Sequence, residues 1–415
     1  MVVCTINVND ILSSLSTALD LTQLGLSGHH KRVAYMSLLL GKHIGLTDYK
    51  MKNLYLAAIM HDIGAISLED KSNLLNLEIR DPFKHCEQGY HFIRRVKFLE
   101  HISNIIKCHH HRWDGQNPDG LKGDLIPVES RIIHVVDRLD ILVNKNQCIL
   151  EQTDNIIESL KGLSGDILEP DILAELFYIG RSESFWLDIV SSFLPSLINK
   201  QLEDIDMMSE CSSLIEIASL FARVIDSKSK FTHRHSLMVS KVAEKLAGIV
   251  GFPSSDIEKM AIAGLLHDLG KLSIPEEILE KPGSLSLQEF KVIKRHTYYT
   301  YRILEQVPYF KEINEWASYH HERLDGKGYP FHLSGKDLSQ GSRILAVSDV
   351  FSALTEDRPY RNGLPQHKVE SIYKEMVSGR ALDAEIVAAL LSSYHEFKDI
   401  NSISVKNNDI MYSVG

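Results

Sequence analysis

The 415-residue chain contains a tandem repeat, and this repeat constrains the fold more than any other feature of the sequence. Five histidines and two aspartates occur in the same order in each half, at an offset of 206 to 212 residues. In both halves the first histidine precedes a His-Asp pair by 32 residues, and a third histidine precedes a double histidine by 24. The positions are His29, His61, Asp62, His85, His109, His110 and Asp137 in the first half, and His235, His267, Asp268, His296, His320, His321 and Asp349 in the second.

Helical periodicity predicts an all-α fold made of two tandem, related helical bundles. The segment that starts at His235 has apolar residues spaced three and four apart and a stop at Gly251. In the next segment, Ser255 followed by Glu258 fits a capping box, and the residues after it are apolar nearly all round, as in a buried helix. Alternating strand-like runs are nearly absent. We expect a first domain over residues 1–150, a packed helical linker over 151–206 and a second domain over 207–415.

The composition excludes several classes of protein. The net charge of −10, from 45 basic and 55 acidic residues, argues against binding of polymeric nucleic acid, whereas a few local cations can still hold a small anion. The five cysteines are scattered without a C-x-x-C pair, as is typical of reduced thiols. No basic segment leads into an apolar run at the N-terminus, and no stretch is long enough to cross a bilayer. We expect a soluble cytoplasmic protein with no membrane partner.

The recurring histidines and aspartates indicate a metal site. Taken alone, Asp349 in its apolar helix could be neutralised by an arginine or lysine, and His267 could be a satisfied core histidine. Neighbouring helical residues diverge by about 100°, so His267 and Asp268 can serve one cluster only if it spans two ions. Imidazoles mixed with carboxylates suit iron, manganese, zinc or nickel better than magnesium or calcium. Because two such metal ions lower the pKa of a water bound to them, we expect hydrolytic chemistry.

Three signatures in the second half resemble the HD-GYP branch of the HD phosphohydrolases. They are HDLGK at 267–271, HHERLDGKGYP at 320–330 and DRPYR at 357–361, within a match that covers about residues 212–391. The resemblance implies an all-α, metal-dependent phosphodiesterase that opens a cyclic dinucleotide, chiefly cyclic di-GMP or alternatively 3′3′-cyclic GMP-AMP, to its linear form. The first half, over about residues 11–144, resembles a second, degenerate HD domain.

The resemblance also implies roles for individual residues. The seven positions of the second half would ligate two transition ions, with iron or manganese expected and nickel or zinc as alternatives. Asp268 would bridge the ions, and Lys271, one helical turn after His267, would stabilise the reacting phosphate. The alternatives are a solvated lysine at 271 and simple turn residues at Asp325 and Lys327. Substrate contacts are expected from Asp325, Lys327, Gly328, Tyr329, Pro330, Arg358 and Arg361.

One departure from the family pattern bears on the number of ions. Members with three metals have a glutamate four residues before the first histidine, where this chain has Phe231. A third ion therefore lacks a ligand, although His233 is close by in the sequence. Two ions are expected in the second half.

The first half keeps the seven presumed ligands but lacks the residues that handle phosphate. His30 is an alternative to His29 as the first ligand, and Ala65 stands where the second half has Lys271. The sequence Asn-Pro-Asp at 117–119 replaces the Gly-Tyr-Pro turn. We expect the first half to hold an additional metal pair, to be catalytically weak and to act as a sensor or regulator of the second.

Two other functions stay open on the sequence alone. One is a catalytically silent signalling module that binds metal and nucleotide, and the intact ligand set with Lys271 argues against it. The other is an HD hydrolase of a different phosphate ester, against which the Gly-Tyr-Pro and Arg-Pro-Tyr-Arg signatures weigh. A homodimer or a signalling-protein partner also stays open.

Overall fold

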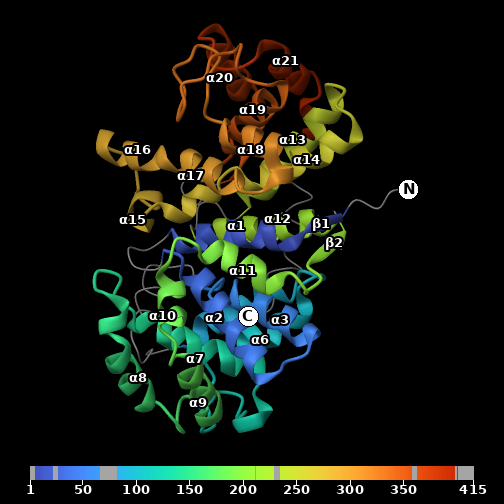
Figure 1. The fold of residues 1–415 in the computed structure, drawn as a ribbon. Helices are drawn as coiled ribbons and strands as arrows, with labels where there is room; N and C mark the ends of the chain where they lie inside the picture. The colour runs from blue at the N-terminus through green and yellow to red at the C-terminus, as the bar shows by residue number, and fades with distance from the viewer. Residues whose placement is uncertain are drawn as a thin grey trace. The chain divides into compact units, whose positions relative to one another are not determined.

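The computed structural model describes residues 5–21, 27–65, 82–210, 212–228, 234–357, 362–397 and 400. Over these ranges nearly all of the regular secondary structure is helical, which confirms the predicted all-α class (Figure 1). The chain divides into two compact units, Met1–Ser213 and Leu214–Gly415. The functional domain limits at residues 150 and 206 stay a prediction.

The first unit is built around α2 (His29–Ile44), which packs against α3 (Asp48–Ala58), α7 (Val128–Leu142) and α11 (Leu194–Leu202). The facing side chains are apolar and fully buried, as shown by Met36, Leu54 and Ile133. Burial of such side chains supplies the main stabilisation of a helical bundle. The other elements are β1 (Thr5–Asn7), α1 (Val8–Asp20), α5 (Phe83–Ile93), η1 (Glu100–Ile102), α6 (Ser103–Lys107), η2 (Gly123–Leu125), η3 (Ile149–Glu151), α8 (Thr153–Lys161), α9 (Pro170–Ile179), α10 (Glu183–Val190) and β2 (Met208–Glu210).

The segment predicted as a packed linker forms the helices α8 to α11. Of these, α9, α10 and α11 pack against α2, and α8 and α9 pack against α7, so the segment belongs to the first unit. Next to it, β1 and β2 form a short antiparallel ribbon in which Ile6 pairs with Ser209. The sequence did not predict this ribbon, because a three-residue strand is too short to show alternation.

The second unit repeats the same core. Here α13 (His235–Ile249) packs against α14 (Ser254–Leu266) and α19 (Gln340–Thr355), as α2 packs against α3 and α7. α17 (Arg295–Leu304) and α18 (Lys311–Ser318) pack together, as α5 and α6 do. The other elements are α12 (Ser212–Ser227), η4 (Leu269–Ser273), α15 (Glu276–Leu279), α16 (Leu287–Ile293), η5 (Pro308–Phe310), α20 (Gln366–Ser378) and α21 (Ala384–Ser392).

The predicted capping box at the start of α14 is wrong. The helix begins at Ser254 after Pro253, and no side chain caps its first turn. Proline fixes φ before the helix starts, so the chain enters α14 without a side-chain cap. A capping box is present at the start of α16, where Ser286 and Glu289 bind each other's backbone N–H groups.

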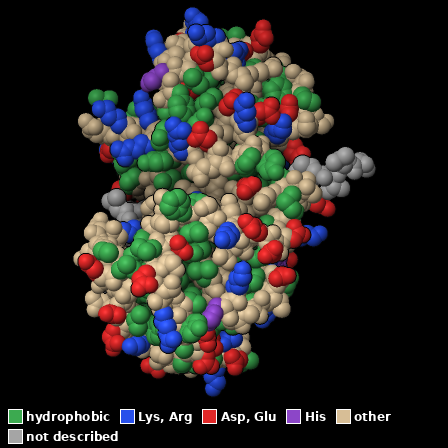
Figure 2. Space-filling model, in the orientation of Figure 1, with side chains coloured by type: hydrophobic (Ala, Val, Ile, Leu, Met, Phe, Trp, Pro, Cys, Tyr) green, Lys and Arg blue, Asp and Glu red, His purple; other side chains and the backbone are tan. Residues whose placement is uncertain are grey.

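The surface shows no field of a single sign on the face drawn in Figure 2, where acidic and basic side chains are interspersed. Among the helices of the described residues, none combines the length and apolar character needed to cross a bilayer.

Candidate metal centres

The seven predicted ligands of the second unit meet in one buried cluster. His235 opens α13, His267 follows the last residue of α14, and Asp349 lies within α19. His235 Nε2 lies 3.1 Å from Asp349 Oδ1, and His267 Nε2 lies 3.9 Å from the same oxygen. His296 and the double histidine come from α17 and from the turn after α18, and the rings of His296 and His321 are 5.2 Å apart.

Asp268 lies in the middle of this cluster and faces both sides of it. Its Oδ1 is 3.5 Å from His296 Nε2. Its Oδ2 is 3.2 Å from His267 Nε2 and 3.9 Å from His235 Nε2. This is the geometry of a carboxylate that can give one oxygen to each of two ions.

Three of the imidazoles are oriented by backbone carbonyl groups. The Nδ1–H groups of His267, His296 and His320 donate to the carbonyl oxygen three residues earlier, at 2.8, 2.7 and 2.6 Å. A carbonyl oxygen can only accept, so Nδ1 carries the hydrogen and Nε2 keeps its lone pair. Fixing one ring nitrogen so that the other can bind metal is typical of histidine ligands.

The resulting lone pairs face one another, which calls for a cation between them. His296 Nε2 and His320 Nε2 are 3.3 Å apart, yet in neutral rings fixed in this way neither nitrogen has a hydrogen to donate. His267 Nε2 is buried and forms no hydrogen bond with any of the described residues. Two nitrogens bound to one ion at about 2.1 Å lie roughly 3.0–3.4 Å apart, so the observed separation fits a shared transition ion.

The donor atoms form two groups, as a two-ion site requires. His235, His267 and Asp268 form one group, and His296, His320 and His321 form the other, with the donor atoms of each within 4.8 Å of one another. Asp349 approaches the first group through Oδ1 and His321 through Oδ2, at 4.0 Å. Nitrogen-rich groups of this kind fit iron, manganese, zinc or nickel.

The cluster favours a cation because its two carboxylates stay ionised while the imidazoles of His296, His320 and His321 stay neutral. Burial alone would raise the pKa of Asp268, but His267 and Lys271 hold that pKa well below its usual range. Burial lowers the pKa of His296 to about 3. Ligands that are already deprotonated bind a cation without releasing protons first.

A glycine in each HD motif makes the close packing of the ligands possible. A Cβ on Gly270 would lie 1.9 Å from the carbonyl oxygen of His296, and one on Gly64 would lie 2.0 Å from that of His85. Any side chain here would push the HD turn away from the helix that carries the third histidine. The glycine of the motif therefore sets the distance between the two ligand groups.

The position of Lys271 differs from the expectation. The helix ends at Leu266, and Lys271 lies in the 3-10 turn η4, so it does not continue the helical face of His267. The tighter turn brings Lys271 Nζ to 2.5 Å from Asp268 Oδ2. The ammonium group thus lies directly beside the Asp268 carboxylate.

The loop after the double histidine is held by Glu322, which the sequence interpretation missed. The buried Glu322 carboxylate accepts hydrogen bonds from Phe331 N at 2.7 Å and Leu333 N at 3.0 Å. Gly328 has no room for a side chain, because a Cβ would lie 2.4 Å from Glu322 Cα. The Tyr329 ring consequently lies 4.9 Å from the His321 ring, beside the cluster.

The other predicted substrate contacts have different outcomes. Asp325 pairs with Arg323 at 2.8 Å and accepts from Lys327 N at 3.0 Å, which is the behaviour of a turn residue. Lys327 is exposed, and Pro330 follows Tyr329 through a cis peptide bond. Arg358 and Arg361, like Phe231 and His233, lie outside the described residues.

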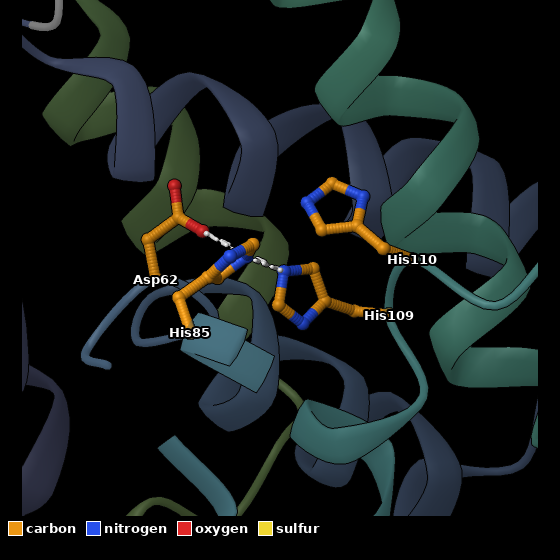
Figure 3. A group of neighbouring side chains, drawn as sticks. All are labelled: Asp62, His85, His109 and His110. Atoms are coloured by element: carbon orange, nitrogen blue, oxygen red, sulfur yellow. Dashed lines mark hydrogen bonds and ion pairs between the residues drawn. The ribbon is translucent and has the colours of Figure 1, made fainter. Parts of the chain in front are cut away.

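The first unit assembles its seven residues in the same way. Figure 3 shows Asp62, His85, His109 and His110, whose donor atoms lie within 4.8 Å of one another. Asp62 Oδ1 is 3.4 Å from His85 Nε2 and 3.5 Å from His109 Nε2, while Asp62 Oδ2 is 3.3 Å from His61 Nε2. The second group of this unit consists of His29, His61 and Asp137.

Each unit also has carboxylates behind its ligands that the sequence interpretation missed. His29 Nδ1 donates to Asp140 at 2.7 Å, and His235 Nδ1 lies 3.4 Å from Glu356. Burial works to lower the pKa of His235, but Asp349 and Glu356 raise it to about 10, so this side of the cluster favours a cation. Carboxylates in this position orient a histidine ligand and raise its basicity.

A further pair of carboxylates extends the repeat by one position. Asp20 accepts from His30 Nδ1 at 2.6 Å, and Asp226 accepts from Ser236 Oγ at 2.8 Å. The two aspartates are offset by the same 206 residues as the first ligands, so the repeat itself could have identified them.

Comparisons with known proteins agree with this arrangement. The sequence profile of the HD domain family matches residues 13–165 and 219–386. A 3′3′-cGAMP-specific phosphodiesterase 1 of Vibrio cholerae is 28% identical over 412 residues, which cover 95% of this chain and 94% of that protein. A cyclic di-GMP phosphodiesterase of Thermotoga maritima is 34% identical over 191 residues, or 45% of this chain and 51% of that one. The crystal structure of V-cGAP3, a cyclic GMP-AMP specific phosphodiesterase of Vibrio cholerae, matches with a TM-score of 0.67 at 23% identity, over 94% of this chain and 98% of that chain.

Proposed function

The chain belongs to the HD domain family, and on that premise we propose that its second unit is a metal-dependent phosphodiesterase that hydrolyses a cyclic dinucleotide. The observation that carries the proposal is the pair of ligand groups joined by the two oxygens of Asp268. The named relatives act on 3′3′-cyclic GMP-AMP or on cyclic di-GMP. The preference between these two substrates and the location in the cytoplasm stay predictions.

The proposed site holds two transition ions, with iron or manganese favoured. When bound, such a pair supplies Lewis acidity and an activated water for in-line hydrolysis of a phosphodiester. The ligands would be His235, His267, Asp268, His296, His320, His321 and Asp349. Lys271 would place its ammonium group on a non-bridging oxygen of the reacting phosphate, since it lies against Asp268 and is partly open to solvent.

The substrate would approach from the side of His321. The His321 side chain is 32% exposed, and that of Lys271 is 22% exposed, whereas His296 and His267 are 1% exposed. Of these four side chains, those of His321 and Lys271 are the ones that solvent reaches, so the cluster opens on their side. An open position beside a buried ligand set is what distinguishes a catalytic metal site from a structural one.

Aromatic and cationic side chains continue outward from that opening. Lys294 Nζ lies 5.1 Å from the centre of the Tyr329 ring and 5.0 Å from that of the Phe290 ring. Phe290 is 40% exposed. An exposed aromatic face beside a cation suits a nucleobase and its phosphate, so we assign Phe290 as a stacking surface for one base.

The proposal is tested by incubating the manganese- or iron-loaded full chain with cyclic di-GMP and with 3′3′-cyclic GMP-AMP and separating the products by chromatography. We expect conversion of at least one of them to the linear dinucleotide, and loss of both metal and activity in His320→Ala. Binding without a product would point to a silent signalling module. Turnover of nucleoside triphosphates alone would point to another phosphate ester as the substrate.

A further inference from the structure

The cluster of the first unit consists of the same seven residue types as that of the second unit, but its side chains are less exposed to solvent. His110 and Asp137 are each 2% exposed, whereas the equivalent His321 and Asp349 are 32% and 12% exposed. The opening through which a substrate would reach the second unit is therefore closed in the first. The repeat identifies the side chains that close it.

Arg138 covers one oxygen of Asp137. Its Nη2 donates to Asp137 Oδ2 at 2.6 Å and its Nε to the same oxygen at 3.2 Å. The guanidinium group is 2% exposed, and the equivalent residue of the second unit is Val350. A buried arginine paired with a carboxylate in this way is costly to displace, because both groups lose a charged partner in a place shielded from water.

His134 covers the other side of the opening. Its ring lies 5.1 Å from the His110 ring, and its Nδ1–H donates to the His111 carbonyl oxygen at 3.2 Å. The equivalent residue of the second unit is Ala346, which is buried and has no side chain long enough to reach over His321 as His134 reaches His110. Arg138 and His134 lie four residues apart on α7, one helical turn from each other and on the same face.

Two further imidazole nitrogens of this cluster point to a bound cation. His110 Nε2 and His30 Nε2 are both buried, and among the described residues neither has a hydrogen-bond partner. The His30 ring lies 5.2 Å from the His61 ring, and its Nδ1–H is fixed by Asp20. A buried nitrogen lone pair costs free energy unless it accepts a hydrogen bond or binds a cation.

We propose that the cluster of the first unit is a closed metal centre, in which Arg138 and His134 shut off the face that is open in the second unit. Its ions are held by the seven ligands, they exchange slowly with solvent, and they do not reach a phosphodiester. The inference rests on the proposed function in one respect, because it takes the cluster of the second unit as the open site with which the closed cluster is compared.

The test follows the release of manganese from the full chain. Protein loaded with Mn²⁺ is diluted into EDTA, freed of chelate by desalting at intervals and analysed for metal by mass spectrometry. We expect two phases of release, of about two ions each, that differ by about tenfold or more in rate, because ions of the first unit leave only when that unit opens locally. His85→Ala should remove the slow phase, and the matched variant His296→Ala should remove the fast phase.

An opening variant tests the two covering residues directly. Arg138→Val combined with His134→Ala introduces the residues that the second unit has, and it should convert the slow phase into a fast one. If this double variant does not fold, as judged by its circular dichroism, His134→Ala alone should still accelerate the slow phase.

The proposal is overturned if wild-type protein releases all its metal in one phase. It is also overturned if His85→Ala keeps the slow phase, or if the folded opening variant releases metal as slowly as wild type. Because the readout is metal content, these results are independent of whether the second unit hydrolyses a cyclic dinucleotide.

Discussion

Replacing Lys271 by methionine tests whether its charge acts on the reacting phosphate. The ammonium group lies 2.5 Å from Asp268 and is 22% exposed, so it is partly shielded from water next to the place of the ions. A unit charge about 4 Å from a phosphate oxygen contributes about 4 kcal/mol at an effective dielectric constant of about 20. Part of this energy is already present in the bound substrate, which is itself charged. We therefore expect kcat to fall by roughly 10²-fold, equivalent to about 3 kcal/mol of transition-state stabilisation.

The assay combines product chromatography with metal analysis of the same sample. Methionine keeps the aliphatic stem of the side chain, so the packing of residue 271 should change little. Lys259→Met is the matched control, because Lys259 pairs with Asp256 and Glu312 elsewhere in the unit, and its kcat should equal that of wild type. A fully metal-loaded Lys271→Met enzyme with kcat within about threefold of wild type would refute the role on phosphate. Loss of metal in this variant would show that Lys271 supports Asp268 instead.

Three other predictions follow from the second unit. Phe290→Ala should raise KM for the cyclic dinucleotide about tenfold through lost base stacking, while its hydrolysis of bis-p-nitrophenyl phosphate stays unchanged. The control variant Tyr309→Ala should hydrolyse both substrates like wild type. An equal loss of activity of Phe290→Ala on both substrates would contradict the stacking role. Gly270→Ala should lower the free energy of unfolding by about 3 kcal/mol or more because of its contact with the His296 carbonyl. Gly248→Ala should be nearly neutral in a denaturant titration, because its Cβ would meet only Ile257 Cδ1 at an ordinary contact distance of 3.8 Å. Burial raises the pKa of Asp226 from 3.8 to about 7. In the metal-free protein, the protonated Asp226 carboxyl therefore stabilises the fold fully below pH 3.8, and this stabilisation is lost as the pH rises through 7. Asp226→Asn should flatten this part of the curve of Tm against pH, and parallel curves for variant and wild type would disprove the prediction.

The candidate ligands could be identified from the sequence because they form a repeat. One buried histidine or aspartate has several explanations, but the same residues at the same spacing in both halves have few. The structure places His267 and Asp268 on a turn after α14 and Asp349 within α19. The predicted helices thus bring these three residues into one cluster.

Features that break the repeat could not be predicted in this way. Asp140 lies three residues after Asp137, whereas Glu356 lies seven residues after Asp349, although both approach the Nδ1 atom of a first histidine. Carboxylates in different registers reach equivalent places only through tertiary packing. The 3-10 turn that carries Lys271 was missed for a similar reason, because periodicity does not distinguish one more helical turn from a tighter one.

The closure of the first cluster also depends on packing. A sequence shows that Arg138 follows Asp137, but an arginine on a helix more often faces solvent than a buried carboxylate. Only its burial and its 2.6 Å contact with Asp137 show that it fills the face that is open in the other unit.

The central claim is that the five histidines and two aspartates of the second unit hold two ions bridged by Asp268. Crystals of manganese-loaded protein measured at the manganese absorption edge test it directly. We predict two anomalous peaks about 3.5–4 Å apart, one beside His235 and His267 and the other beside His296 and His320, with Asp268 between them. A single peak, or no peak within bonding distance of these side chains, would contradict the claim.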